Sequence, residues 1–146
     1  MSSAARSILI CLAGLALALL VVGVVSGTLL RHVVQILPIV AALLLTSRRP
    51  AIGACAAIPI FAFWTLIVVL IWLFLLGLSR IANGTYTVAE IIATFLMAGF
   101  SVFGLAKTIG ASRGVAPGMR FTCILAFAIF QIAAMAVSMM RAVANR

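Results

Sequence analysis

The chain has 146 residues, of which 67% are hydrophobic and 8% are charged, with ten Lys and Arg against a single acidic residue, Glu90. Soluble domains carry roughly a quarter charged residues of both signs, so this composition excludes an ordinary soluble protein. One acid and one histidine provide no carboxylate pair, nucleophile–base pair or metal-ligand set. We therefore expect neither enzyme activity nor a metal site.

Four long apolar segments cover residues 7–30, 51–78, 88–106 and 121–140. A helix needs about 20 apolar residues to cross the hydrocarbon core of a membrane. Lipid offers the backbone no hydrogen-bond partners, so spanning segments form helices or closed barrels. Barrel strands alternate apolar and polar residues, whereas these segments are continuously apolar. The sequence predicts an all-α integral membrane protein with a single transmembrane domain over residues 1–146.

The first segment carries Gly23 and Gly27, spaced as in a GxxxG motif. Such spacing lets helix backbones approach closely, so we expect both glycines on a helix-packing face. A basic N-terminus before an apolar run is also typical of a signal peptide. This run exceeds the roughly 7–15 residues of a cleavable signal, and we interpret it as a retained first helix.

His32 is the only histidine, and it lies beside Arg31 between the first and second apolar segments. A single histidine excludes bis-histidine haem ligation within one chain. Since an interfacial histidine usually has no ligand, we expect no cofactor. The alternative is a quinone or a haem near His32.

A shorter apolar segment covers residues 33–47 and contains Pro38. It is long enough to span if the bilayer thins locally or the end residues snorkel, which gives a compact bundle of five helices. The alternative is four spanning helices and one re-entrant or interfacial segment. We expect this segment to span.

Glu90 follows Thr87 by three residues, at the start of the predicted helix 88–106. A Thr-x-x-Glu pattern is typical of a capping box, and the helix dipole favours a negative charge there. We therefore expect Glu90 to cap this helix. The alternative is an ion, proton or interhelical charge site in which Glu90 titrates or pairs with Arg80 or Arg141.

Thr94 and Ser101 belong to a stripe of polar and small residues along the predicted helix 88–106. Gln131 lies near the middle of the last apolar segment. A side-chain amide at that depth needs a partner, and interhelical hydrogen bonds in membranes are worth about 0.6–2 kcal/mol. We expect Gln131 to bond to Thr94 or Ser101. The three cysteines share no close spacing and are expected to be structural.

The basic residues lie at the ends of the apolar segments rather than on one face. This distribution predicts contact with anionic lipid head groups and not with nucleic acid. The positive-inside rule places the loops at 48–50 and 107–120 in the cytoplasm. Abundant Ala and the preference for Arg over Lys suggest a bacterial protein of the inner membrane.

These features predict a small non-catalytic integral membrane protein that is an accessory or structural subunit of a larger bacterial inner-membrane complex. Its partners would be other membrane subunits and lipids. Two alternatives remain open. One is a small homo-oligomeric proton- or ion-coupled transporter or channel that uses Glu90. The other is a quinone- or lipid-binding helper in membrane electron transfer.

Overall fold

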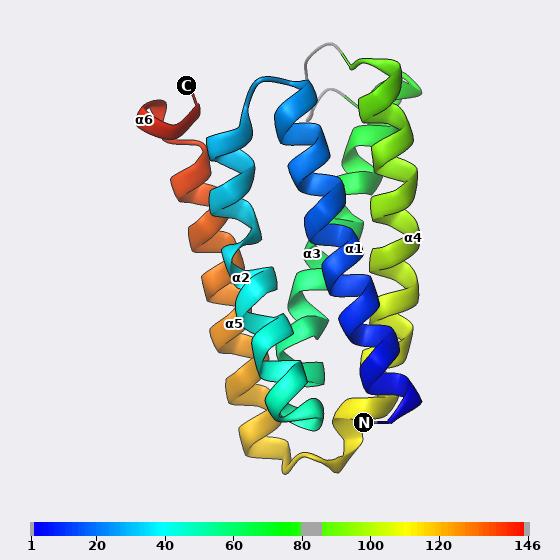
Figure 1. Cartoon of the computed structure of the whole chain (residues 1–146), viewed down its shortest axis with the longest axis vertical. Coiled ribbons are helices and arrows are strands. Elements are labelled where there is room, and N and C mark those ends of the chain that lie inside the picture. The colour runs from blue at the N-terminus through cyan, green and yellow to red at the C-terminus, as the bar shows by residue number, and fades with distance from the viewer. Residues whose placement is uncertain (1, 80–85, 145–146) are drawn as a thin grey trace.

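The computed structural model describes residues 2–79 and 86–144, and this part of the chain is helical without strands. Five long helices run up and down beside one another, so that the N- and C-termini lie at opposite ends (Figure 1). They are α1 (Ser3–Val25), α2 (Leu29–Arg48), α3 (Pro50–Leu75), α4 (Val88–Ala111) and α5 (Pro117–Ser138). A 3-10 turn, η1 (Ser112–Gly114), and a short helix, α6 (Arg141–Ala144), complete the described elements.

Each of the five long helices in the described residues is long and apolar enough to cross a membrane. The doubtful segment 33–47 belongs to α2, which has 20 residues and is therefore about 30 Å long. The all-α prediction is confirmed, and the five helices are compatible with a membrane bundle.

The helix ends differ from the predicted ones because of glycines and caps. Gly27 and Gly77 adopt left-handed backbone angles, with φ of +68° and +72°, and such glycines commonly end helices. α1 and α3 therefore end before residues 30 and 78. Pro50 and Pro117 occupy the first turns of α3 and α5, where their missing N–H groups cost nothing.

α3 is the central helix, since it packs against α1, α2, α4 and α5. α1 also packs against α2 and α4, and α5 packs against α2. α4 and α5 therefore lie on opposite sides of α3 (Figure 1). Large apolar side chains cover much of the outer surface, as expected for a surface that faces lipid.

At two places an aromatic ring of one helix packs directly against a glycine of a neighbouring helix. A Cβ atom at Gly104 would lie 2.5 Å from the ring of Phe61, so α3 and α4 approach closely there. A Cβ atom at Gly14 would lie equally close, at 2.5 Å, to the ring of Phe100, which joins α1 to α4. Both contacts lie in the middle of the bundle, closer to the end where α1 begins than Leu19 and Val22 are.

Candidate ligand-binding cavity

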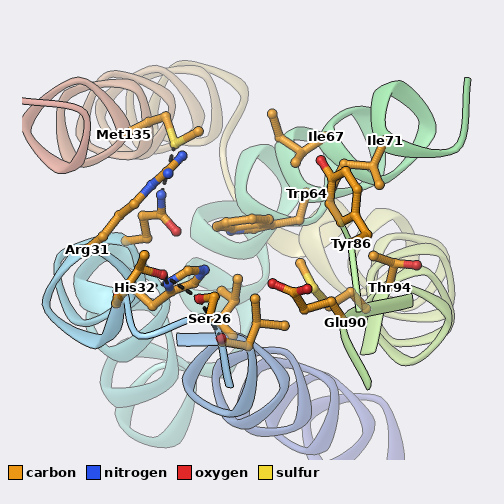
Figure 2. A pocket seen from close by; sticks show the side chains of 15 residues that line it. Ser26, Arg31, His32, Trp64, Ile67, Ile71, Tyr86, Glu90, Thr94 and Met135 are labelled. Atoms are coloured by element: carbon orange, nitrogen blue, oxygen red, sulfur yellow. Dashed lines mark hydrogen bonds between the residues drawn. The ribbon is translucent and has the colours of Figure 1, made fainter. Parts of the chain in front are cut away.

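A cavity of about 250 Å³ opens among the helices at the end where α1 finishes and α2 and α4 begin (Figure 2). Its lining includes apolar side chains from α1, α3, α4 and α5. The polar or aromatic residues of the lining are Ser26, Thr28, Arg31, His32, Gln35, Trp64, Tyr86, Glu90 and Thr94. The cavity thus combines one cation, one anion and several hydrogen-bonding groups in an otherwise apolar bundle.

Trp64 is a deeply buried donor of this lining. It is 3% exposed, and its indole Nε1 is buried without a hydrogen-bond partner in the described residues. The Nε of Arg31 is likewise buried without a partner there. A buried donor left unsatisfied costs about 1–3 kcal/mol, and more if it is charged. Trp64 and Arg31 both line the cavity, so an acceptor held there lies beside the two residues that carry these donors.

Glu90 caps α4, as the Thr-x-x-Glu pattern predicted. Its Oε2 accepts hydrogen bonds from the backbone N of Thr87 at 2.7 Å and from the Thr87 hydroxyl at 2.8 Å. The Thr87 Oγ1 in turn accepts from the Glu90 backbone N at 3.3 Å. This completes the capping box. Both side-chain bonds use Oε2, and the carboxylate faces the cavity (Figure 2), where Oε1 has no hydrogen-bond partner among the described residues.

The cation that shares a cavity with Glu90 is Arg31, which was not among the predicted partners. Arg80 and the side chain of Arg141 lie outside the described residues. Between Arg31 and Glu90, both in the described part of the chain, no ion pair is formed, and Trp64 lies between them (Figure 2). The signal that could have joined them is the up-and-down order of the helices, because it places the start of α2 and the start of α4 at the same end of the bundle.

His32 contacts its own helix and α1. Its Nδ1 lies 3.1 Å from the carbonyl oxygen of Thr28 and 3.2 Å from the Thr28 hydroxyl. A Cβ atom at Gly23 would lie 3.0 Å from the His32 Cβ, so Gly23 packs on α2. Gly27, in contrast, lies in the turn after α1, and therefore it is not on a helix-packing face.

Tyr86 lies before the start of α4 and lines the cavity. Burial raises the pKa of its phenol, and the nearby negative charge of Glu90 raises it further. The positive charge of Arg31 lowers this pKa and so acts in the opposite direction. The phenol is therefore a neutral hydrogen-bonding group at the cavity over the physiological pH range.

Gln35 joins α2 to α5 beside the cavity. Its Nε2 donates to the hydroxyl of Ser138 at 3.0 Å and lies 3.3 Å from the sulfur of Met135. Gln35 was not singled out from the sequence, although an amide within an apolar segment is the same signal that identified Gln131. This bond holds two helices that contribute Arg31 and Met135 to the lining.

The expected bonds between Gln131 and either Thr94 or Ser101 do not form. Gln131 is 0% exposed, yet neither its amide oxygen nor its nitrogen has a partner in the described residues, and the same is true of the Ser101 hydroxyl. The reason is that Gln131 is on α5, whereas Thr94 and Ser101 are on α4, across α3. Thr94 instead accepts a 3.0 Å hydrogen bond from Nε1 of Trp72 on α3.

The cysteines and most of the basic residues lie away from this cavity. Cys11 and Cys55 are buried and Cys123 is partly buried, all as free thiols, and in the described residues no group of His, Cys and Glu side chains could hold a metal ion. Most of the basic residues lie at the opposite end, where α1 begins and where α2–α3 and α4–α5 connect (Figure 1). These residues are Arg6, Arg48, Arg49, Lys107, Arg113 and Arg120.

Comparisons of the chain with models of protein families, with curated proteins and with solved structures found no match. Function is therefore argued from the chemistry of the cavity. Its lining includes Arg31 and Trp64, each with a buried donor that has no partner in the described residues, and the carboxylate of Glu90. Such an arrangement can bind a small polar group.

Proposed function

We propose that this chain is a small, non-catalytic membrane protein that binds the polar head group of an amphipathic molecule in the cavity. The observation that carries this proposal concerns Trp64, which lines the cavity and whose Nε1 is buried without a partner in the described residues. Buried polar groups in proteins are nearly always hydrogen-bonded. A bound head group with an acceptor oxygen supplies the missing bond.

The dimensions of the cavity support a head group rather than a larger ligand. Pockets for drug-sized molecules usually have volumes of roughly 300–1,000 Å³, and this cavity has about 250 Å³. The apolar tail of the bound molecule would lie in the surrounding lipid.

Coupled transport through Glu90 is less well supported by the geometry. A transporter needs a path from the cavity to the other end of the bundle. Beyond the cavity, the rings of Phe61 and Phe100 pack against Gly104 and Gly14, and Phe61 is fully buried. Glu90 is also used as a helix cap. Binding of a head group therefore accounts for more of the cavity than ion movement does.

We further propose that the protein lies in the inner membrane of a bacterium and assists a larger complex there. The loops at 48–50 and 107–120 would face the cytoplasm, in agreement with the positive-inside rule. The arrangement of the helices supports this, since these loops lie at the same end of the bundle (Figure 1). Anionic lipid head groups would contact the basic residues of this end.

Labelling from one side of the membrane tests this orientation. In a variant without the native cysteines, Ser26→Cys and Ser47→Cys place exposed thiols at opposite ends of the bundle. In intact cells, a membrane-impermeant maleimide is expected to label position 26 and not position 47. The reverse pattern would contradict the orientation, and labelling of both positions would contradict a membrane-spanning arrangement.

Bound molecules after purification test the binding proposal. The protein is purified in mild detergent, and its extract is analysed by mass spectrometry. We expect a bound amphipathic molecule in the wild type, reduced about tenfold or more in Trp64→Phe and Arg31→Gln, since a hydrogen bond to a charged group is worth about 1.5–3 kcal/mol. Trp72→Phe and Arg49→Gln are matched controls that leave the cavity donors in place.

Equal amounts of bound molecule in all four variants, or no bound molecule in the wild type, would overturn the binding proposal. The same purification tests the proposed assembly. Unlike membrane subunits that remain with the chain support an accessory role. A stable homo-oligomer whose proton flux in liposomes is abolished by Glu90→Gln would favour the transporter instead.

A further inference from the structure

We infer that the head group bound in the cavity is zwitterionic, with a phosphate held by Arg31 and Trp64 and an ammonium group held by Glu90. This inference rests on the proposed function and names the chemical class of its ligand. The class comprises phosphates joined to an amine by a short carbon chain, as in phosphoethanolamine and phosphocholine. It occurs both in free molecules and in membrane lipids.

The donor side of the cavity suits a phosphate. The guanidinium of Arg31 and the indole N–H of Trp64 donate hydrogen bonds and accept none. The Nε of Arg31 and the Nε1 of Trp64 are both buried without partners in the part of the chain that is described. Hydrogen bonds from Arg to phosphate are charge-assisted and about twice as strong as neutral ones.

The acceptor side suits an ammonium group. Glu90 is the only acidic residue of the chain, and its Oε2 is used by the capping box while the carboxylate still faces the cavity (Figure 2). Two aromatic side chains, Trp64 and Tyr86, line the same cavity. Aromatic rings attract ammonium groups through cation–π interactions. Both the negative charge of Glu90 and these rings therefore favour a cation at this part of the cavity.

The separation of the two charges argues against neutral and anionic head groups. Arg31 and Glu90 face one cavity, yet in the described residues they are not ion-paired. A neutral quinone neutralises neither charge, and a purely anionic head group brings a second negative charge towards Glu90. A zwitterion places each of its charges beside the opposite charge of the protein.

Titrations with defined ligands test this inference. The background is Trp72→Phe, in which Trp64 is the only remaining tryptophan and its fluorescence reports on the cavity. Phospholipid-free protein in a non-ionic detergent is titrated with short-chain phosphatidylethanolamine, phosphatidylcholine and phosphatidylglycerol, free phosphoethanolamine and a short-chain quinone. We expect phosphatidylethanolamine to bind about tenfold or more tightly than phosphatidylglycerol.

Two variants separate the roles of the charged residues. Glu90→Gln is expected to abolish the preference for phosphatidylethanolamine over phosphatidylglycerol, while Arg31→Gln weakens the binding of both lipids. Gln is also compatible with a capping box, so α4 is retained. Thr87→Ala is the matched control, because it breaks the capping box but keeps the carboxylate, and we expect it to preserve the preference.

The possible outcomes distinguish this inference from the proposed function. Phosphatidylglycerol or the quinone binding as tightly as phosphatidylethanolamine would overturn the zwitterion but leave head-group binding intact. If none of the ligands binds, both proposals fail. Equal binding of free phosphoethanolamine supports a soluble zwitterion, and much tighter binding of the lipid supports a lipid head group. Equal binding of phosphatidylcholine supports recognition of the ammonium group by the aromatic rings.

Discussion

The Oε2 of Glu90 accepts a 2.7 Å hydrogen bond from the backbone N of Thr87, so that the only acidic side chain of the protein closes the first turn of α4. The same side chain lines the cavity that also contains Arg31 and Trp64. A cap and a binding group are therefore combined in one residue. The cap uses Oε2, and the carboxylate still faces the cavity (Figure 2).

The capping box predicts the effect of Thr87→Ala on stability. Loss of an N-cap threonine costs about 0.5–2 kcal/mol, and we expect a decrease of about 1 kcal/mol in the free energy of unfolding, measured in detergent. Thr122→Ala is the control, because the Thr122 hydroxyl is exposed and bonds only within its own helix, to the carbonyl oxygen of Gly118. An equal loss in both variants would contradict a specific contribution of the cap.

Two glycines of α4 provide a matched test of helix packing. At Gly104 an added methyl group would lie 2.5 Å from the ring of Phe61, whereas at Gly99 nothing lies within 4 Å. We expect Gly104→Ala to destabilise the protein by about 1–3 kcal/mol. Gly99→Ala should leave stability unchanged or raise it by up to about 1 kcal/mol. Similar unfolding curves for the two variants would contradict the close approach of α3 and α4.

The bond between Gln35 and Ser138 predicts coupling between α2 and α5. In a double-mutant cycle of Gln35→Leu and Ser138→Ala, we expect an interaction energy of about 0.6–1.7 kcal/mol. Ser101→Ala serves as the comparison, because its hydroxyl is buried without a partner in the described residues, and its removal should not destabilise the protein and should raise stability by up to about 1–3 kcal/mol. Additive effects of the two cycle mutations would show that the bond contributes nothing.

Tyr86 is the only tyrosine, so the ultraviolet absorbance of tyrosinate reports on this residue alone. Burial and the charge of Glu90 raise its pKa, and the folded protein should titrate above the ordinary value of about 10. The raised pKa contributes stability at pH values below the unfolded pKa, and this contribution is lost as the pH rises through the folded pKa. Glu90→Gln should lower the midpoint. A midpoint at or below that of the unfolded chain would contradict the burial of Tyr86.

The helices and the cap of α4 were predictable because each depends on residues close together in the sequence. Apolar length identified the helices, and the spacing of Thr87 and Glu90 identified the capping box. The turn at Gly27 was mistaken for a packing position, since a GxxxG spacing is the same in a helix and at its end. Only the backbone angle of Gly27, with φ of +68°, distinguishes the two.

The partners of the buried polar residues were not predictable, because they depend on which helices are neighbours. Gln131 was assigned to Thr94 or Ser101 on the assumption that α5 packs against α4. The central position of α3 separates these two helices and brings Trp72 to Thr94 instead. The cavity was not predictable for the same reason. Its residues Arg31, Trp64 and Glu90 belong to three different helices and meet only because these helices pack together.

The nuclear magnetic resonance signal of the Trp64 indole N–H tests the central claim most directly. The chain has two tryptophans, and Trp72, whose N–H already donates to Thr94, provides an internal reference. In protein labelled at the indole nitrogens, addition of short-chain phosphatidylethanolamine should shift the Trp64 N–H signal downfield and leave that of Trp72 in place. A Trp64 signal that stays unchanged at saturating lipid, or that moves only together with Trp72, would contradict a head group bound in this cavity.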